Sequence, residues 1–136
     1  MTDREAEVRL RIMRAFAATG APPALAPDDR AALDGLAARH VVALSGDPAA
    51  PVLMAHPFAA HRTGARVTSA GHAPGEWWGN CAWDGLGIVG LLGLADATVE
   101  SNGVALHVRG GALVETDVLF HVAVPARAWW DDIGFT

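Results

Sequence analysis

The chain has 136 residues with a formal net charge of −5 at pH 7, and 51% of its residues are hydrophobic while 18% are charged. This length suits one domain with a buried core, and the apolar content excludes a disordered chain. The negative charge argues against a nucleic-acid partner, since such proteins neutralise phosphates with basic side chains. A single cysteine excludes an internal disulfide, so we expect a cytoplasmic protein. The charged start and the short apolar runs predict neither a secretion signal nor a membrane span.

The first part of the chain is expected to be helical and to end in a short hairpin. Residues 3–18 and 27–40 repeat apolar side chains at helical spacing, which predicts two helices. Apolar segments at 41–44 and 52–55 flank a turn-rich sequence and predict two strands. Residues 1–55 are therefore predicted to form a trimmed winged-helix-like N-terminal part. It lacks the basic helix that DNA binding requires.

The rest of the chain, residues 56–136, is predicted to form a second unit. Gly, Pro, His and Trp accumulate there up to residue 80. The patterns predict a helix over 80–93 and, around it, strands at 66–68, 76–78, 96–100, 104–109 and 117–124 and a closing turn at 126–133. The expected fold class is α+β: a small N-terminal helical part, then a mixed or antiparallel sheet packed on the helix that carries the cysteine.

The only cysteine, Cys81, has a carboxylate three residues after it, at Asp84. Asn80 is predicted to cap the helix, so that Cys81 lies in its first turn, where backbone N–H groups lower a thiol pKa. Asp84 is expected on the same helical face, with its pKa raised by the thiolate and by an apolar wall of Trp78 and Trp83. Such a pair combines a nucleophile with a proton donor. On residue types alone, a buried structural cysteine followed by a capping aspartate is the commoner arrangement.

The segment 79–88, Gly-Asn-Cys-Ala-Trp-Asp-Gly-Leu-Gly-Ile, resembles the active-site segment of the organomercurial (alkylmercury) lyases, which runs Cys-Ala-x-Asp-x-Leu. Further upstream, similarity to the sequence that leads into the family's motif is found at His56-Pro57-Phe58, Thr63 and Arg66-Val67. The resemblance covers about residues 25–130 and is specific at 79–88. It implies cleavage of a carbon–mercury bond, in which one thiolate captures mercury, a carboxyl group protonates the departing carbon and a second thiolate helps to hold the metal.

By position, Cys81 corresponds to the first cysteine of that family and Asp84 to its acid. The second cysteine has no counterpart, since its place falls near Glu115, and a carboxylate is a poor substitute for a thiolate on a soft metal. The resemblance thus implies Cys81 and Asp84 as catalytic residues and Cys81 as the ligand of mercury, the substrate or product. Trp78, Trp83 and Glu115 are the expected substrate-binding residues. No cofactor is expected, and the oligomeric state stays open.

The residues leave three functions open. The first is an organomercurial-lyase-like enzyme, and the second is a noncatalytic protein that binds an organomercurial or another soft electrophile through Cys81 alone. The third is an interaction or regulatory domain in which Cys81 is buried. The histidines show no metal-ligand spacing and are expected at the surface or in loops. In Trp129-Trp130-Asp131-Asp132, an aromatic side chain either anchors the chain in the core, its more usual role, or closes over Cys81 while an aspartate assists proton transfer.

Overall fold

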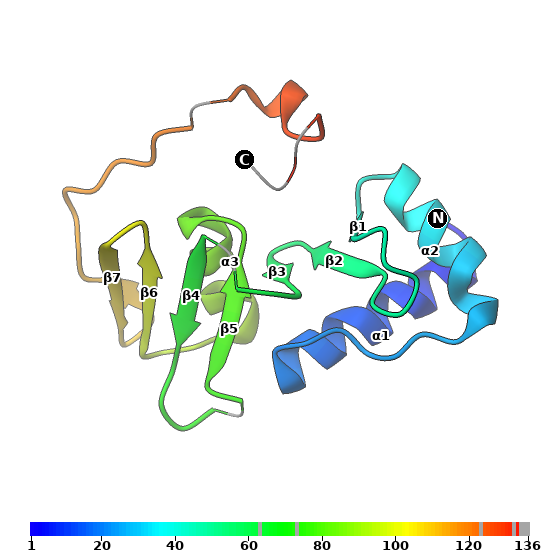
Figure 1. Ribbon diagram of the computed structural model, residues 1–136. Helices are drawn as coiled ribbons and strands as arrows, with labels where there is room; N and C mark the ends of the chain where they lie inside the picture. The colour runs from blue at the N-terminus through cyan, green and yellow to red at the C-terminus, as the bar shows by residue number, and fades with distance from the viewer. Residues whose placement is uncertain (63, 73, 123, 132, 134–136) are drawn as a thin grey trace.

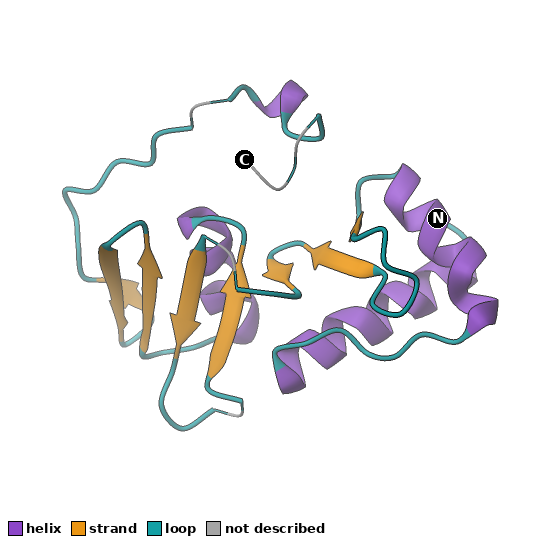
Figure 2. Ribbon diagram, in the orientation of Figure 1, coloured by secondary structure: helices purple, strands orange, loops and turns teal. Residues whose placement is uncertain are grey.

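The computed structural model describes residues 1–62, 64–72, 74–122, 124–131 and 133, and Thr63 and Asp132 therefore lie outside the described residues. The fold is α+β, as predicted. Figures 1 and 2 show two N-terminal helices beside a small sheet, followed by a larger sheet with a third helix against it. The elements, in chain order, are α1 (Asp3–Thr19), η1 (Pro27–Asp29), α2 (Arg30–Ala38), β1 (Ala43–Leu44), β2 (Val52–Ala55), β3 (Phe58–Ala59), β4 (Ala65–Thr68), β5 (Glu76–Gly79), α3 (Ala82–Leu92), β6 (Ala97–Ser101), β7 (Val104–Arg109), β8 (Ala112–Leu113) and η2 (Ala126–Ala128).

Helix α1 begins and ends with the signals that its sequence contains. The side chain of Thr2 accepts a hydrogen bond from the backbone N–H of Glu5, and the Glu5 carboxylate accepts one from the backbone N–H of Thr2. This reciprocal capping satisfies two N–H groups that a helix start leaves without partners. Gly20 ends the helix with a φ of 72°, a left-handed conformation that glycine adopts without strain. The predicted first helix is confirmed within one residue.

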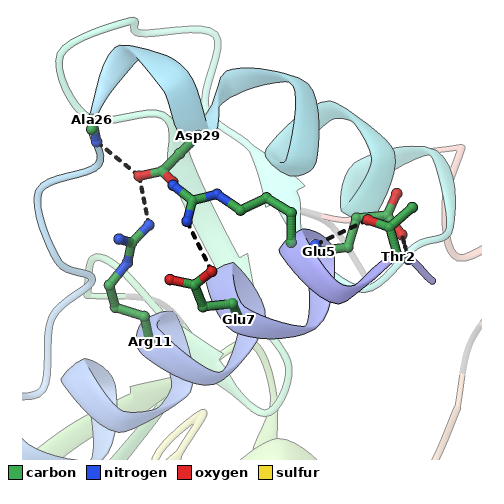
Figure 3. A network of polar contacts seen from close by, with 7 residues as sticks. Thr2, Glu5, Glu7, Arg11, Ala26 and Asp29 are labelled. Carbon is green, nitrogen blue, oxygen red and sulfur yellow. Dashed lines mark hydrogen bonds and ion pairs between the residues drawn. The ribbon is translucent and has the colours of Figure 1, made fainter.

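A buried carboxylate connects η1 to α1. Asp29 is fully buried and accepts hydrogen bonds from the backbone N–H of Ala26 at 2.9 Å, from Arg4 at 2.7 Å and from Arg11. Figure 3 shows Asp29 between Arg11 and Ala26. The hydrogen bond from the Arg11 guanidinium is the largest influence on Asp29 and holds the pKa of this carboxyl below its usual value despite burial. Asp29 thus serves as a charged anchor between the two helices.

One hydrophobic core runs through both parts of the chain. The rings of Phe16 on α1 and Phe58 on β3 are stacked with centroids 5.3 Å apart. Trp77 on β5 is buried, and its indole N–H donates to the carbonyl oxygen of Ala17 at 3.2 Å. Strand β3 lies beyond residue 55 yet pairs with β2 and completes the sheet β1-β2-β3. The predicted division after residue 55 stays a prediction, and the buried cluster extends across it.

Helix α3 packs on the sheet β5-β4-β6-β7-β8, in which all neighbouring strands are antiparallel. Four glycines in and after this helix, at positions 85, 87, 90 and 93, weaken it by propensity unless they allow a close approach. At Gly85 a Cβ atom would lie 2.4 Å from Cγ1 of Val99 on β6, closer than real side chains come. Gly85 is therefore what lets the backbone of α3 lie directly on the sheet.

The strand predicted at 117–124 is wrong, because the described residues of this range are not in a strand. The chain leaves the sheet after β8. The N–H of Val114 donates to the carbonyl oxygen of His107 on β7, and the N–H of His107 donates to the side chain of Glu115 at 2.7 Å. The Glu115 side chain thus occupies the backbone N–H of His107 on β7, which a strand continuing beyond β8 would need as a hydrogen-bond donor. No helix in the described residues is long and apolar enough to span a membrane.

Candidate functional site

Cys81 is located where β5 ends and α3 begins. Its backbone is extended, with φ −144° and ψ 176°, and its carbonyl oxygen accepts the first helical hydrogen bond, from Gly85 at 3.0 Å. Cys81 is therefore the N-cap residue itself, and the prediction that Asn80 caps the helix is wrong by one position. The Asn80 amide instead donates to the carbonyl oxygen of Ile133 at 3.0 Å.

Asp84, in the first turn of α3, faces the thiol. Its Oδ2 lies 3.7 Å from Sγ of Cys81, at hydrogen-bond range for sulfur. Gly79, the last residue of β5, makes this arrangement possible, because a Cβ atom there would lie 2.9 Å from Cβ of Asp84. The expected pairing of Cys81 and Asp84 on one face of the helix start is confirmed in its geometry.

The structure adds His56, which sequence reasoning left among the scattered histidines. His56 follows β2, and its Nδ1 lies 3.9 Å from Oδ1 of Asp84. Its other ring nitrogen, Nε2, is buried and has no hydrogen-bond partner among the described residues. Pro57, joined to His56 by a cis peptide bond, faces α3 at Gly87. The available signal was the resemblance of His56-Pro57-Phe58 to the sequence preceding the cysteine motif.

The surroundings shift both acidities in the same direction. Burial raises the pKa of the Cys81 thiol, and the Asp84 carboxylate raises it further, against the opposing backbone N–H groups of Asp84 and Trp83. The expectation of a lowered thiol pKa is therefore wrong, because burial outweighs the helix start. Burial also raises the pKa of Asp84, as expected, while His56 and the hydrogen bonds with Cys81 act against this increase. The expectation that Cys81 contributes to the increase is therefore wrong. The site thus combines a protonated thiol with a carboxyl group that retains its proton to higher pH than usual.

The two tryptophans expected at the site lie in different surroundings. Trp78 on β5 is half-buried, its indole N–H donates to Glu76, and the guanidinium of Arg62 lies 5.7 Å from its ring. Trp83 is 67% exposed, and its ring meets the edge of Phe120 with centroids 5.6 Å apart. Trp83 therefore does not form the buried apolar wall that we expected beside Asp84. The burial that raises the pKa of the Asp84 carboxyl group therefore comes from groups other than Trp83.

Glu115 is not brought to the thiol. It follows β8, at the opposite edge of the sheet from β5, which leads into Cys81. Its carboxylate binds the backbone N–H and the ring Nδ1 of His107, both at 2.7 Å, which lowers its pKa to about 2. The substrate-binding role expected for Glu115 was carried over by position from the second cysteine of the resembled family, and the structure places this residue at the far edge of the sheet.

Trp130, from the last described part of the chain, lies against the histidine beside Asp84. Its ring stacks on His40 with centroids 4.2 Å apart and meets His56 edge-on at 5.5 Å. His40 and His56 also line a cavity of about 220 Å³ between α1 and the first sheet. One tryptophan of the terminal pair is therefore near the site.

Among the residues that the structure describes, no group of three or more His, Cys, Asp or Glu side chains is arranged to hold a metal ion. Comparisons with protein-family profiles, curated protein sequences and solved structures give no match for this chain. The chemistry of the site therefore has to be argued from its own groups. A thiol, a carboxyl group whose pKa is raised and a neighbouring imidazole suit capture of a soft electrophile followed by proton transfer.

Proposed function

We propose that the protein is an organomercurial-lyase-like enzyme in which Cys81 captures an organomercurial and Asp84 protonates its carbon. The observation that carries this proposal is the 3.7 Å approach of Sγ to Oδ2. A carboxyl group that contacts the sulfur also lies beside a metal bound to that sulfur, and catalysis requires the reacting atoms to be held close together in this way. The resemblance of residues 79–88 supports the same assignment.

Capture is an exchange of ligands on mercury. The sulfur of Cys81 forms a bond to mercury, the bond from mercury to its original counter-ligand breaks, and the thiol proton leaves with that ligand. Sulfur is a soft donor and mercury a soft metal, so the exchange is favourable. The raised pKa of the thiol means that this step includes loss of a proton.

Cleavage then transfers one proton from Asp84. The carboxyl O–H bond breaks, the electron pair of the carbon–mercury bond takes up the proton, and a hydrocarbon leaves. The resulting carboxylate lies beside mercury on Cys81 and compensates part of its charge. Burial raises the pKa of Asp84 and so keeps a larger fraction of it protonated beforehand.

Release requires sulfur from outside the chain, since Cys81 is its only cysteine. Two external thiols displace mercury as a bis-thiolate and return one proton each to Cys81 and Asp84. The absent second cysteine is also the observation that favours the second candidate, a protein that binds an organomercurial through one thiol without cleaving it.

The decisive measurement is methane release from methylmercury in the presence of excess small thiol. We expect the unaltered protein to release methane, Cys81→Ser to release none, and Asp84→Asn to be slower by about 10²–10⁴-fold, the usual contribution of a positioned proton donor. Asp84→Asn should still bind one mercury per chain. Asp34→Asn, at an exposed carboxylate on α2, is the matched control and should release methane normally.

Two outcomes would contradict the lyase. Methane release no faster than with the small thiol alone, together with stoichiometric binding that Cys81→Ser abolishes, would establish the binding protein instead. Normal release by Asp84→Asn would remove the proton-donor role.

A further inference from the structure

The described residues of 114–133, here called the C-terminal strap, cross the molecule without joining a sheet. In Figure 1 the strap is the orange-to-red trace that leaves the sheet near β7, passes along the top of the view and returns towards the first helices. Large apolar side chains along it remain exposed, among them Leu119 at 96% and Val122 at 61%. The strap is thus tied to the molecule by a few local contacts.

The first residues of the strap, Val114 and Glu115, are hydrogen-bonded to His107 on β7, and several of its later contacts lie next to the thiol and the acid. Ile133 accepts the hydrogen bond from Asn80, the residue before Cys81. Phe120 contacts Trp83, the residue before Asp84. The strap therefore touches the helix start on both sides of the thiol.

Trp130 makes the most extensive of these contacts. Its ring lies parallel to His40, at an interplanar angle of 9°, and edge-on to His56. It also packs with Ile133 against the buried cluster that contains Met54 and Ala59. Because His56 is itself next to Asp84, only one side chain separates the Trp130 ring from the proposed proton donor.

We propose that Trp130 determines which substrates reach Cys81: with the strap in place the site takes small alkyl mercurials, and Trp130 excludes aryl ones. That the reagents are mercurials rests on the proposed function. That Trp130 selects reagents by size rests on the contacts of the strap with Asn80, Trp83 and the two histidines. Cys81 is only half-buried, so a methyl-sized reagent reaches it past the strap. A planar aromatic reagent has to displace the Trp130 ring, because that ring occupies the aromatic surface of His40 and His56.

A cavity lined by both histidines offers space for an aromatic group. It has a volume of about 220 Å³, and its lining combines the apolar side chains of Ile12, Met13 and Val42 with the two histidines and Arg9. An apolar protein cavity of roughly 150 Å³ is enough to hold a benzene ring. Removing the indole would free the ring contacts of His40 and His56, which line this cavity, for an incoming aromatic group.

The single cysteine makes the test direct, because every thiol reagent reports on Cys81 alone. Rates of labelling would be measured with methyl methanethiosulfonate, a small reagent, and with 5,5′-dithiobis(2-nitrobenzoate), a bulky aromatic one. For Trp130→Ala we expect the aromatic reagent to react about tenfold or more faster and the small one less than about threefold faster, since local opening limits only the large reagent. Trp130→Phe, which keeps a smaller ring, should fall between.

A second variant loosens the strap without altering it. His40→Asn removes the stacking partner of Trp130, and asparagine tolerates the left-handed backbone at this position, where φ is 59°. It should shift the ratio of the two rates in the same direction. His72→Asn, at an exposed histidine between β4 and β5, is the control and should leave the ratio unchanged.

Circular dichroism would show that each variant is folded. An equal increase for both reagents, or no change in the ratio in folded Trp130→Ala and His40→Asn, would overturn the proposal. Labelling does not involve a carbon–mercury bond, so a shifted ratio without any hydrocarbon release would reject the lyase and leave the size selection standing. Where methane is released, Trp130→Ala should increase benzene release from phenylmercury relative to methane release from methylmercury.

Discussion

An aspartate lies at the start of two helices in this protein, and the surroundings shift the pKa of the two carboxyl groups in opposite directions. Asp29, before α2, receives two guanidinium groups and a backbone N–H, and its pKa is lowered. Asp84, in the first turn of α3, faces a thiol and an imidazole, and burial raises its pKa. The difference shows that burial alone does not decide the role of a carboxyl group. Two guanidinium groups make Asp29 an anchor, whereas burial beside a thiol and an imidazole favours the protonated form of Asp84.

The largest expected effect comes from removing each charge in turn. Asp29→Asn should lower the melting temperature by on the order of 10 °C, because it leaves two arginines without their shared partner. Asp84→Asn should raise it by roughly 2–4 °C, since a partly desolvated carboxylate is replaced by a neutral isostere. Differential scanning calorimetry at neutral pH measures both. Changes of the same sign would abolish the distinction between the two helix starts.

The pH dependence of stability should separate the same two groups. The pKa of Asp29 is lowered in the folded protein, so its stabilising contribution is present above its unfolded pKa and is lost as pH falls through the folded value. The pKa of Asp84 is raised, so the folded protein binds this proton more tightly and gains stability as pH falls from the raised value towards the unfolded one. The stability advantage of Asp84→Asn over the unaltered protein should therefore shrink on acidification.

Helix α3 is positioned by close contact, and a pair of glycines tests this. Gly85→Ala should destabilise the protein by about 1–3 kcal/mol, because the new methyl group meets Val99. Gly90→Ala, on the same helix with nothing near its Cβ position, should stabilise it by up to about 1 kcal/mol through helix propensity. Urea unfolding of both variants measures the difference. A stabilising Gly85→Ala would mean that α3 does not rest on β6.

The smallest effect is expected at a third carboxylate, Glu115, whose pKa is lowered like that of Asp29. Its pKa is lowered to about 2 by the backbone and ring of His107, so its contribution to stability is lost as pH falls from its ordinary value of 4.5 towards about 2. Glu115→Gln should remove this acid-dependent loss. It should leave labelling of Cys81 within about twofold of normal, because distant sites act independently. A large fall in labelling or in methane release would return Glu115 to the site.

Most elements with a strong periodic pattern were predictable. Helix α1 repeats Val8, Ile12 and Phe16 on one face, and all three are fully buried. The segment 117–124 has an equally clear pattern for a strand, but a strand also needs a neighbour with free backbone groups. Local sequence does not contain that information, and Glu115 takes the N–H of His107.

The candidate site shows the same difference between what local sequence predicts and what depends on distant parts of the chain. The approach of Cys81 to Asp84 follows from their spacing of three residues on a helix, so it could be predicted. The contributions of His56 and Trp130 could not, because they come from residues far away in the sequence. The direction in which the pKa of the Cys81 thiol shifts could not be predicted either, since it depends on how much the surrounding chain buries the sulfur.

The contact between Gly85 and Val99 has a consequence for evolution. The two positions share a fixed volume, so a larger residue at 85 is acceptable only with a smaller one at 99. Relatives of this chain that keep α3 in the same place should vary at these two positions together, and Gly85→Ala combined with Val99→Ala should recover part of the stability that the first change removes. Such paired variation would identify chains that share this arrangement of helix and sheet even where Cys81 itself has been replaced.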